Sequence, residues 1–175
     1  LRDGSFTGKF TIPGNCSFIA FKFFQGNHDL PEAVDNNDDK GYITTPLDEK
    51  GRMLPGAAIA EALLKTPSLG THWINYFKDS NHQADSQTLN QLLEKEGTIK
   101  GSDPKYYIDT YAAIMSKAKG SEGISILRDG INKMLKDKSL TEKQYMSIER
   151  VCRYTIKDTS LANKVSSTIL SKYPN

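Results

Sequence analysis

Three oxygen-bearing side chains in a polar loop come closest to a metal site. Asp35, Asn37 and Asp39 alternate in the segment VDNNDDKGY, and alternating oxygen ligands of this kind converge on Ca²⁺ in calcium-binding loops. The match to an EF-hand loop is incomplete, because Gly41 falls one place late and Pro46 stands where the bidentate Glu belongs. One hypothesis is therefore a calcium-stabilised module. The simpler one is a cluster of Asx turns, in which these side chains bond to nearby backbone.

The other candidate ligands and nucleophiles lack the spacing that catalysis requires. The sequence contains no HExxH, no phosphate-binding glycine loop and no GxSxG motif. His28, His72 and His82 do not have metal-ligand spacing. Cys16 and Cys152 form no CxxC pair, so we interpret them as a long-range disulfide or, more simply, as two small buried thiols. We therefore predict no catalytic or cofactor-binding residue.

Several aromatic side chains offer a contact surface rather than chemistry. Tyr106, Tyr107 and Tyr111 cluster near a predicted helix start, and Trp73 lies in a separate apolar run. Packing in the core is the simplest explanation for such residues. The alternative is that Trp73, Tyr106 and Tyr107 line a groove for a protein or peptide partner.

The composition is that of an ordinary globular domain. Of the 175 residues, 37% are hydrophobic and 25% are charged, which argues against disorder. No apolar run approaches the roughly 18–20 residues of a membrane span. The net charge is only +2 and the lysines are scattered, so nucleic-acid binding is not indicated. The chain begins at Leu1 with no signal peptide, and we expect it to be a trimmed piece of a longer protein.

The first third of the chain reads as strands and turns. Residues 5–12 and 17–24 alternate or concentrate aromatic and β-branched side chains, which is typical of strands. In the second of these, Ile19, Phe21 and Phe23 form a uniformly apolar set, and we expect them to face the core.

A polar loop and a third extended run follow these strands. Residues 25–40 are rich in Asn and Asp, which indicates a loop. Since two strands are not stable alone, residues 42–47 are expected to add a third strand, or further strands precede Leu1 in the parent protein.

The rest of the chain has helical periodicity. Its Pro, Gly and capping residues place helix boundaries, and the short connections favour antiparallel neighbours. Glu94 and Glu96 fall on different helix faces, so no paired acid–base role is predicted for them. The predicted helices span residues 57–64, 71–78, 85–96, 105–119, 121–138, 141–157 and 160–173.

These patterns predict an α+β fold in two parts. Residues 1–55 form a β-sheet segment, a small antiparallel sheet or partial β-sandwich. Residues 56–175 form a mainly helical segment, an array of antiparallel helix hairpins. The two segments are expected to pack as separate units or as one compact unit.

Four stretches, in order, resemble a known family. They are IAFKFFQG at residues 19–26, DNNDDKGY at 35–42, GRMLPGA at 51–57 and KYPN at 172–175. Together they resemble the N-terminal, non-catalytic region of TlpA-type thioredoxin-like thiol-disulfide oxidoreductases of the Gram-negative envelope. The family's catalytic CxxC lies in its thioredoxin domain, and no residue here matches it, so no catalytic role is carried over.

The resemblance implies a role without chemistry of its own. It implies an accessory domain in the periplasm or cell envelope that positions a downstream thioredoxin domain, mediates dimerisation or contacts a client. It leaves open a lipid anchor on the parent protein. Two further hypotheses stand beside it: a free-standing helical scaffold that binds a protein or peptide, and the calcium-stabilised module described above.

Overall fold

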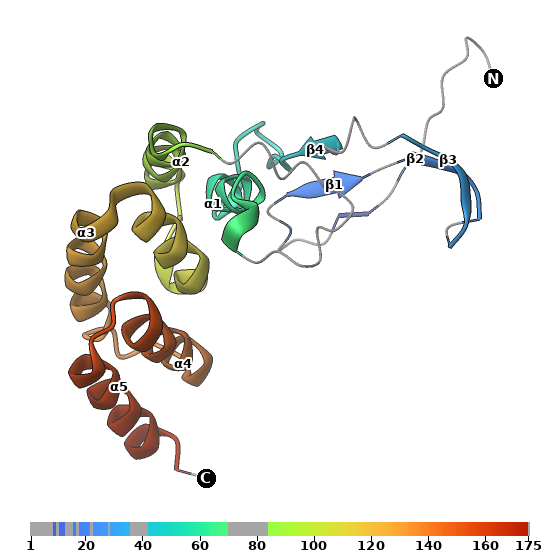
Figure 1. Cartoon of the computed structure of the whole chain (residues 1–175). Helices are drawn as coiled ribbons and strands as arrows, with labels where there is room; N and C mark the ends of the chain where they lie inside the picture. Colours follow the sequence, from blue (N-terminus) through green and yellow to red (C-terminus); the bar gives the residue numbers. More distant parts are fainter. Residues whose placement is uncertain are drawn as a thin grey trace.

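The chain folds as an α+β protein, as the sequence predicts. The computed structural model describes residues 9, 11–12, 16, 18–21, 23–27, 29–35, 42–69 and 84–174. Within these residues, short antiparallel strands come first and five α-helices follow in contacting antiparallel pairs. The helices follow one another along an arc, and the strands lie on the side of α1 that faces away from the other helices (Figure 1).

The strands form two short antiparallel ladders. In one ladder Phe21 pairs with Tyr42, and in the other Phe23 pairs with Asp35. Only residue 22 separates the first two strands in the sequence, whereas residues 36–41 separate their two partners. The strands are β1 (Ile19–Phe21), β2 (Phe23–Gly26), β3 (Pro31–Asp35) and β4 (Tyr42–Thr44).

The strand predictions are confirmed in part, and the prediction of a loop over residues 25–40 is wrong where residues 25–26 end β2 and residues 31–35 form β3. Residues 42–44 do add a strand, which pairs with β1. Phe21 stacks on Tyr42 with ring centroids 5.6 Å apart, and Phe23 meets the same ring edge-on at 5.3 Å. However, Phe21 and Phe23 are exposed, so the expectation that they face the core is wrong. Among the described residues, no helix makes extensive contact with these strands, and the aromatic rings pack on one another.

Two predicted elements fall wholly or largely outside the described residues. Of the predicted strand at residues 5–12, the structure describes Lys9, Thr11 and Ile12, which are not in a strand. The predicted helix at residues 71–78 lies outside the described part of the chain.

The helices agree closely with the predicted boundaries. The predicted helix at 105–119 begins later than expected, at Ile108, because a short 3₁₀ turn, η3 (Pro104–Tyr106), precedes it. A π-helical turn, η4 (Val151–Thr155), continues the fourth helix. The α-helices are α1 (Ala57–Leu64), α2 (Ser86–Thr98), α3 (Ile108–Met134), α4 (Glu142–Arg150) and α5 (Thr159–Lys172), and a second 3₁₀ turn, η1 (Pro67–Leu69), follows α1.

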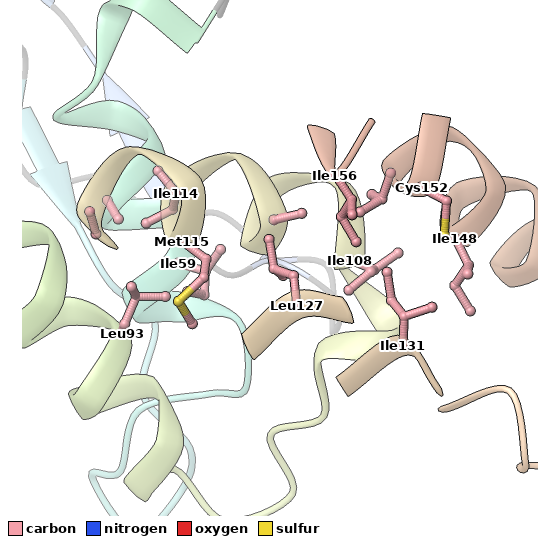
Figure 2. Packing of buried hydrophobic residues seen from close by; sticks show 14 of the residues in the cluster. Ile59, Leu93, Ile108, Ile114, Met115, Leu127, Ile131, Ile148, Cys152 and Ile156 are labelled. Carbon is pink, nitrogen blue, oxygen red and sulfur yellow. The ribbon is translucent and has the colours of Figure 1, made fainter. Parts of the chain in front are cut away.

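One continuous apolar core runs through the helices. Each helix contributes the side chains that recur at helical spacing, and neighbouring helices along the chain pack on one another. Figure 2 shows these side chains meeting between the helices. The set predicted to point inward from α4 and η4 is buried throughout: Tyr145, Ile148, Val151, Cys152 and Ile156.

The long helix α3 is two helices that meet at Gly120. Gly120 has φ 56° and ψ −128°, a conformation that L side chains rarely adopt. The sequence places a boundary at this glycine, between predicted helices at 105–119 and 121–138, and the break is confirmed. Gly123 follows at the inside of the corner, where a Cβ atom would lie 2.5 Å from the carbonyl oxygen of Met115. The corner therefore needs one glycine for its backbone and another for its close packing.

Replacing Gly120 tests whether backbone strain alone holds this corner. A Cβ atom at Gly120 would meet nothing within 4 Å, so Gly120→Ala should cost only the strain of a positive φ, about 1–2 kcal/mol of unfolding free energy. Gly130 is also in open space but has no positive φ. Gly130→Ala should therefore stabilise α3 by about 0.5–1 kcal/mol. Urea denaturation measures both, and a stabilising Gly120→Ala would contradict the assignment.

Candidate functional site

The proposed calcium ligands are described only in part. The Tyr42 hydroxyl lies 2.9 Å from each oxygen of the Asp35 carboxylate and donates to it. Asn37 and Asp39 lie outside the described residues. In the part of the chain that the structure describes, no group of three His, Cys, Asp or Glu side chains is arranged to hold a metal ion. The calcium hypothesis thus stays a prediction, with the Asp35 carboxylate already hydrogen-bonded to Tyr42.

The aromatic residues separate into exposed and packed side chains. Tyr106 is 70% exposed, so core packing is the wrong interpretation for this residue. Tyr107 and Tyr111 are half-buried and pack against the core cluster, and burial raises the pKa of Tyr111. Trp73 lies outside the described residues, as do all three histidines.

The two cysteines are free thiols rather than a disulfide. Cys152 is fully buried, as the simpler sequence interpretation predicts, but Cys16 is only half-buried, and its Sγ donates to the Phe18 carbonyl oxygen. Burial, with the nearby Asp158 and Glu149 carboxylates, raises the pKa of Cys152 to about 11. The neutral thiol therefore dominates at neutral pH, and thiolate chemistry is disfavoured there.

The most enclosed charged group is the carboxylate of Glu96 in the last turns of α2. Glu96 is only 2% exposed. Its Oε1 accepts hydrogen bonds from the Gly56 N–H at 2.7 Å, the Ser102 hydroxyl at 2.5 Å and the Tyr107 hydroxyl at 2.9 Å. Its Oε2 accepts one from the Ala58 N–H at 3.1 Å. One side chain thus joins the start of α1, the end of α2 and the approach to α3.

Glu96 supplies the cap that α1 lacks in its own sequence. The N-cap position is Gly56, which has φ 86° and no side chain to accept from the first turn. The carboxylate also places negative charge at the positive end of the helix dipole. One signal of this missing cap in the sequence is that the helix starts directly after Pro55 and Gly56, with no Ser, Thr, Asp or Asn at the N-cap position. A second signal is that Glu96 lies on the same face of α2 as Leu89, Leu92 and Leu93.

The hydroxyl groups beside Glu96 complete its surroundings. The Ser102 and Tyr107 hydroxyl oxygens are also in hydrogen-bonding contact, so one of the two hydroxyls shares its single proton between Glu96 and the other hydroxyl. Burial, and then the neighbouring Glu96 carboxylate, raises the pKa of Tyr107. The phenol therefore stays protonated and donates a hydrogen bond to Glu96. With four donors on its two oxygens, the Glu96 carboxylate has no role open to it as a base for an outside molecule. Its function is to hold the helices together.

An exposed stripe on α4 and η4 is the candidate functional surface. Glu142, Met146, Arg150 and Tyr154 recur every four residues and are all exposed. Met146 is 57% exposed and Tyr154 is 69% exposed, both high values for large apolar side chains. We call these four residues the α4 stripe.

A groove flanks the α4 stripe on each side. The Tyr106 groove has a volume of about 650 Å³ and includes Lys105, Tyr106, Tyr107, Lys143 and Arg150 in its lining. One of the cations there already forms ion pairs within the chain: the Lys105 Nζ lies 2.9 Å from Asp137 Oδ2 and 3.4 Å from Asp103 Oδ2.

The second groove lies between α4 and α5. This Leu170 groove has a volume of about 460 Å³ and is lined by Met146, Arg150 and Tyr154, together with Ile169 and Leu170 from α5. Leu170 is 73% exposed. Arg150 lines both grooves, so the two hollows and the α4 stripe form one continuous surface.

No protein-family model, curated protein or solved structure matches the chain. Among the described residues, none of the helices combines the length and apolar character needed to cross a membrane.

Removing the Glu96 carboxylate tests its role as a cap. Glu96→Ala should lower the unfolding free energy by about 3 kcal/mol, because two buried backbone N–H groups and two hydroxyls lose their acceptor. Tyr107→Phe removes a single donor and should cost about 1 kcal/mol. Glu94→Ala, at an exposed position of the same helix, is the matched control and should change little. Equal effects of Glu96→Ala and Glu94→Ala in urea denaturation would contradict this role.

The reactivity of Cys152 tests its burial and raised pKa. In a Cys16→Ser variant, the native protein should react with a thiol-specific disulfide reagent at least about a hundredfold more slowly than the urea-unfolded protein. Two pKa units reduce the thiolate fraction by that factor, and burial slows the reaction further. The measurement is the release of the coloured leaving group with time. Equal rates in the native and unfolded states would show that the thiol is accessible.

Proposed function

We propose that this chain is a non-catalytic protein-interaction module, the accessory part of an envelope thiol-disulfide oxidoreductase that precedes its thioredoxin domain. The observation that carries the interaction role is the α4 stripe with its two grooves. Here Met146, Tyr154 and Leu170 are exposed on adjoining elements of an otherwise well-packed helical array. An exposed group of large apolar side chains on a packed domain is typical of a contact surface.

The residue types on this surface support a protein partner. Tyr, Met and Arg are the side chains that protein interfaces concentrate in their centres, because they bury much area and make several kinds of contact. Arg150 is already oriented: its Nε and Nη2 lie 3.0 Å and 2.9 Å from the two oxygens of Asp109. A pre-oriented arginine loses less side-chain entropy when a partner binds.

The reactive groups within the described residues support a role without catalysis. The buried carboxylate of Glu96 is occupied by four intramolecular donors. The Cys152 thiol is buried and its pKa is raised. A catalyst requires reactive groups that converge on a space open to substrate, and these two do not.

The family resemblance supports the accessory role in particular. The stretch at residues 51–57 leads into α1, and its Gly56 is the N-cap position that Glu96 closes. The stretch at residues 19–26 spans β1 and β2. The first of these stretches thus lies at the joint between strands and helices and the second forms the strands, as suits a module that spaces and supports another domain.

A second candidate is a free-standing scaffold that binds a peptide. The Tyr106 groove favours it, because Tyr106 is exposed beside a hollow of about 650 Å³. A hollow of this size is within the range that accommodates a ligand.

The parent gene and a redox assay test the accessory role together. The reading frame is expected to continue past Asn175 into a thioredoxin domain with a CxxC motif. The parent protein should then reduce insulin in the presence of dithiothreitol, whereas residues 1–175 alone should not exceed the rate with dithiothreitol alone. A frame that stops at Asn175, or that continues into a different fold, would defeat the accessory role.

A further inference from the structure

The charges on the exposed side of α4 are arranged symmetrically about Met146. Glu142 lies four residues before Met146, and Arg150 lies four residues after it. Lys143 and Glu149 are likewise three residues before and three residues after. In both pairs, the two positions equally distant from Met146 carry opposite charges.

Such an arrangement is complementary to itself. When two copies of a helix pack antiparallel about a two-fold axis, residues equally distant from the axis on opposite sides face each other. With the axis at Met146, Glu142 of each copy faces Arg150 of the other, and Met146 faces Met146. The ion pairs of opposite sign then fall on both sides of an apolar centre.

We propose that the α4 stripe is a two-fold interface, in which a second copy of this chain packs its own α4 antiparallel to the first with Met146 at the axis. The inference rests on the proposed function only in taking the α4 stripe as a contact surface, and it names the partner. The Glu142–Arg150 pairs set the register, and Met146 with Tyr154 and Leu170 supplies the apolar contact.

The side chains on the stripe are free to make these contacts. Glu142 has no hydrogen bond or ion pair with another side chain among the described residues, and it is exposed. Arg150 binds Asp109 through Nε and Nη2, and Nη2 also donates to Ser147. Its Nη1 group takes part in none of these bonds and remains for a carboxylate of the second copy.

Lys143 and Glu149 do not form a second charge pair across the axis. Lys143 lines the Tyr106 groove and Glu149 lines the Leu170 groove, on opposite flanks of the α4 stripe. Glu149 is also held within the chain: Arg153 Nη2 lies 2.5 Å from its Oε1, and the Ser166 hydroxyl lies 3.4 Å from the same atom. The register therefore depends on Glu142 and Arg150.

The balance of charge favours a second copy over a partner of strong single sign. The wall of the Tyr106 groove carries Lys105, Lys143 and Arg150, but Asp103, Asp109 and Asp137 are bonded to two of these cations. The Leu170 groove adds Glu142 and Glu149. A surface with both signs in similar number selects neither a strongly acidic nor a strongly basic partner, whereas it matches a rotated copy of itself.

Sedimentation equilibrium of the chain tests the interface directly. The wild-type chain should dimerise with a dissociation constant at or below the micromolar range, as for a small specific interface. Met146→Glu places two carboxylates at the axis, and Glu142→Arg places an arginine opposite Arg150. Each should raise the dissociation constant at least about tenfold. Lys164→Glu, an exposed charge change on α5 outside both grooves, should leave it unchanged.

Cysteine cross-linking tests the register. In a Cys16→Ser background, Met146→Cys should form an intermolecular disulfide on mild oxidation, because a residue at a two-fold axis faces its own copy. Ile126→Cys, also exposed but on α3, should not. Cys152 is buried and does not compete.

The outcomes separate this inference from the proposed function. A wild-type chain that stays monomeric up to about 100 μM overturns the two-fold interface. So does a dimer that Met146→Glu leaves intact, or cross-linking that is equal for Met146→Cys and Ile126→Cys. None of these results bears on the accessory role, which the parent reading frame and the insulin assay decide. Thermal unfolding of each variant confirms that a lost dimer is not a lost fold.

Discussion

The carboxylate of Glu96 is the constraint on which the rest of the helical array depends. A buried carboxylate costs several kcal/mol unless donors surround it, and here two backbone N–H groups and two hydroxyls do so. The donors come from the start of α1 and from the segment that leads into α3, whereas the acceptor comes from α2. The carboxylate keeps all four donors only when all three parts are in place. The cluster therefore fixes the angle at which the chain leaves its strands and enters its helices.

Further along the chain, the ends of the helices are set by local interactions that can be predicted from the sequence. Asp85 accepts from the Thr88 N–H at the start of α2, and Thr141 forms a capping box with Gln144 at the start of α4. Gly120 breaks α3 where the sequence places a boundary. These features were predictable because a cap, a glycine corner and an apolar stripe each involve residues within a few positions of one another.

What the sequence did not reveal depends on contacts between distant residues. Gly56 and Glu96 are 40 positions apart, and no local pattern says which acid closes which helix. The strand residues Phe21 and Phe23 show the same limit in a prediction that was wrong. Alternation correctly shows that they share a face, but burial requires a covering layer, and the helices that the structure describes do not provide one. The exposure of Tyr106 and of the α4 stripe was hard to predict for the same reason, since an aromatic side chain in a helix is normally assigned to the core.

The exposure of the α4 stripe follows from how well the opposite face of α4 is buried. Tyr145, Ile148 and Cys152 are all buried, and they fix the rotation of the helix about its axis. Met146 and Arg150 are then forced outward, because a helix of 3.6 residues per turn presents only one face to the core. The π turn that follows, in which the Ile156 N–H bonds to the Val151 carbonyl oxygen, carries Val151 and Ile156 inward and Tyr154 outward. Turns of this kind are rare and recur at functional sites. The core thus gains little from Met146 or Tyr154, and the grouping of these exposed side chains on one face is the feature that supports the proposal of a contact surface there.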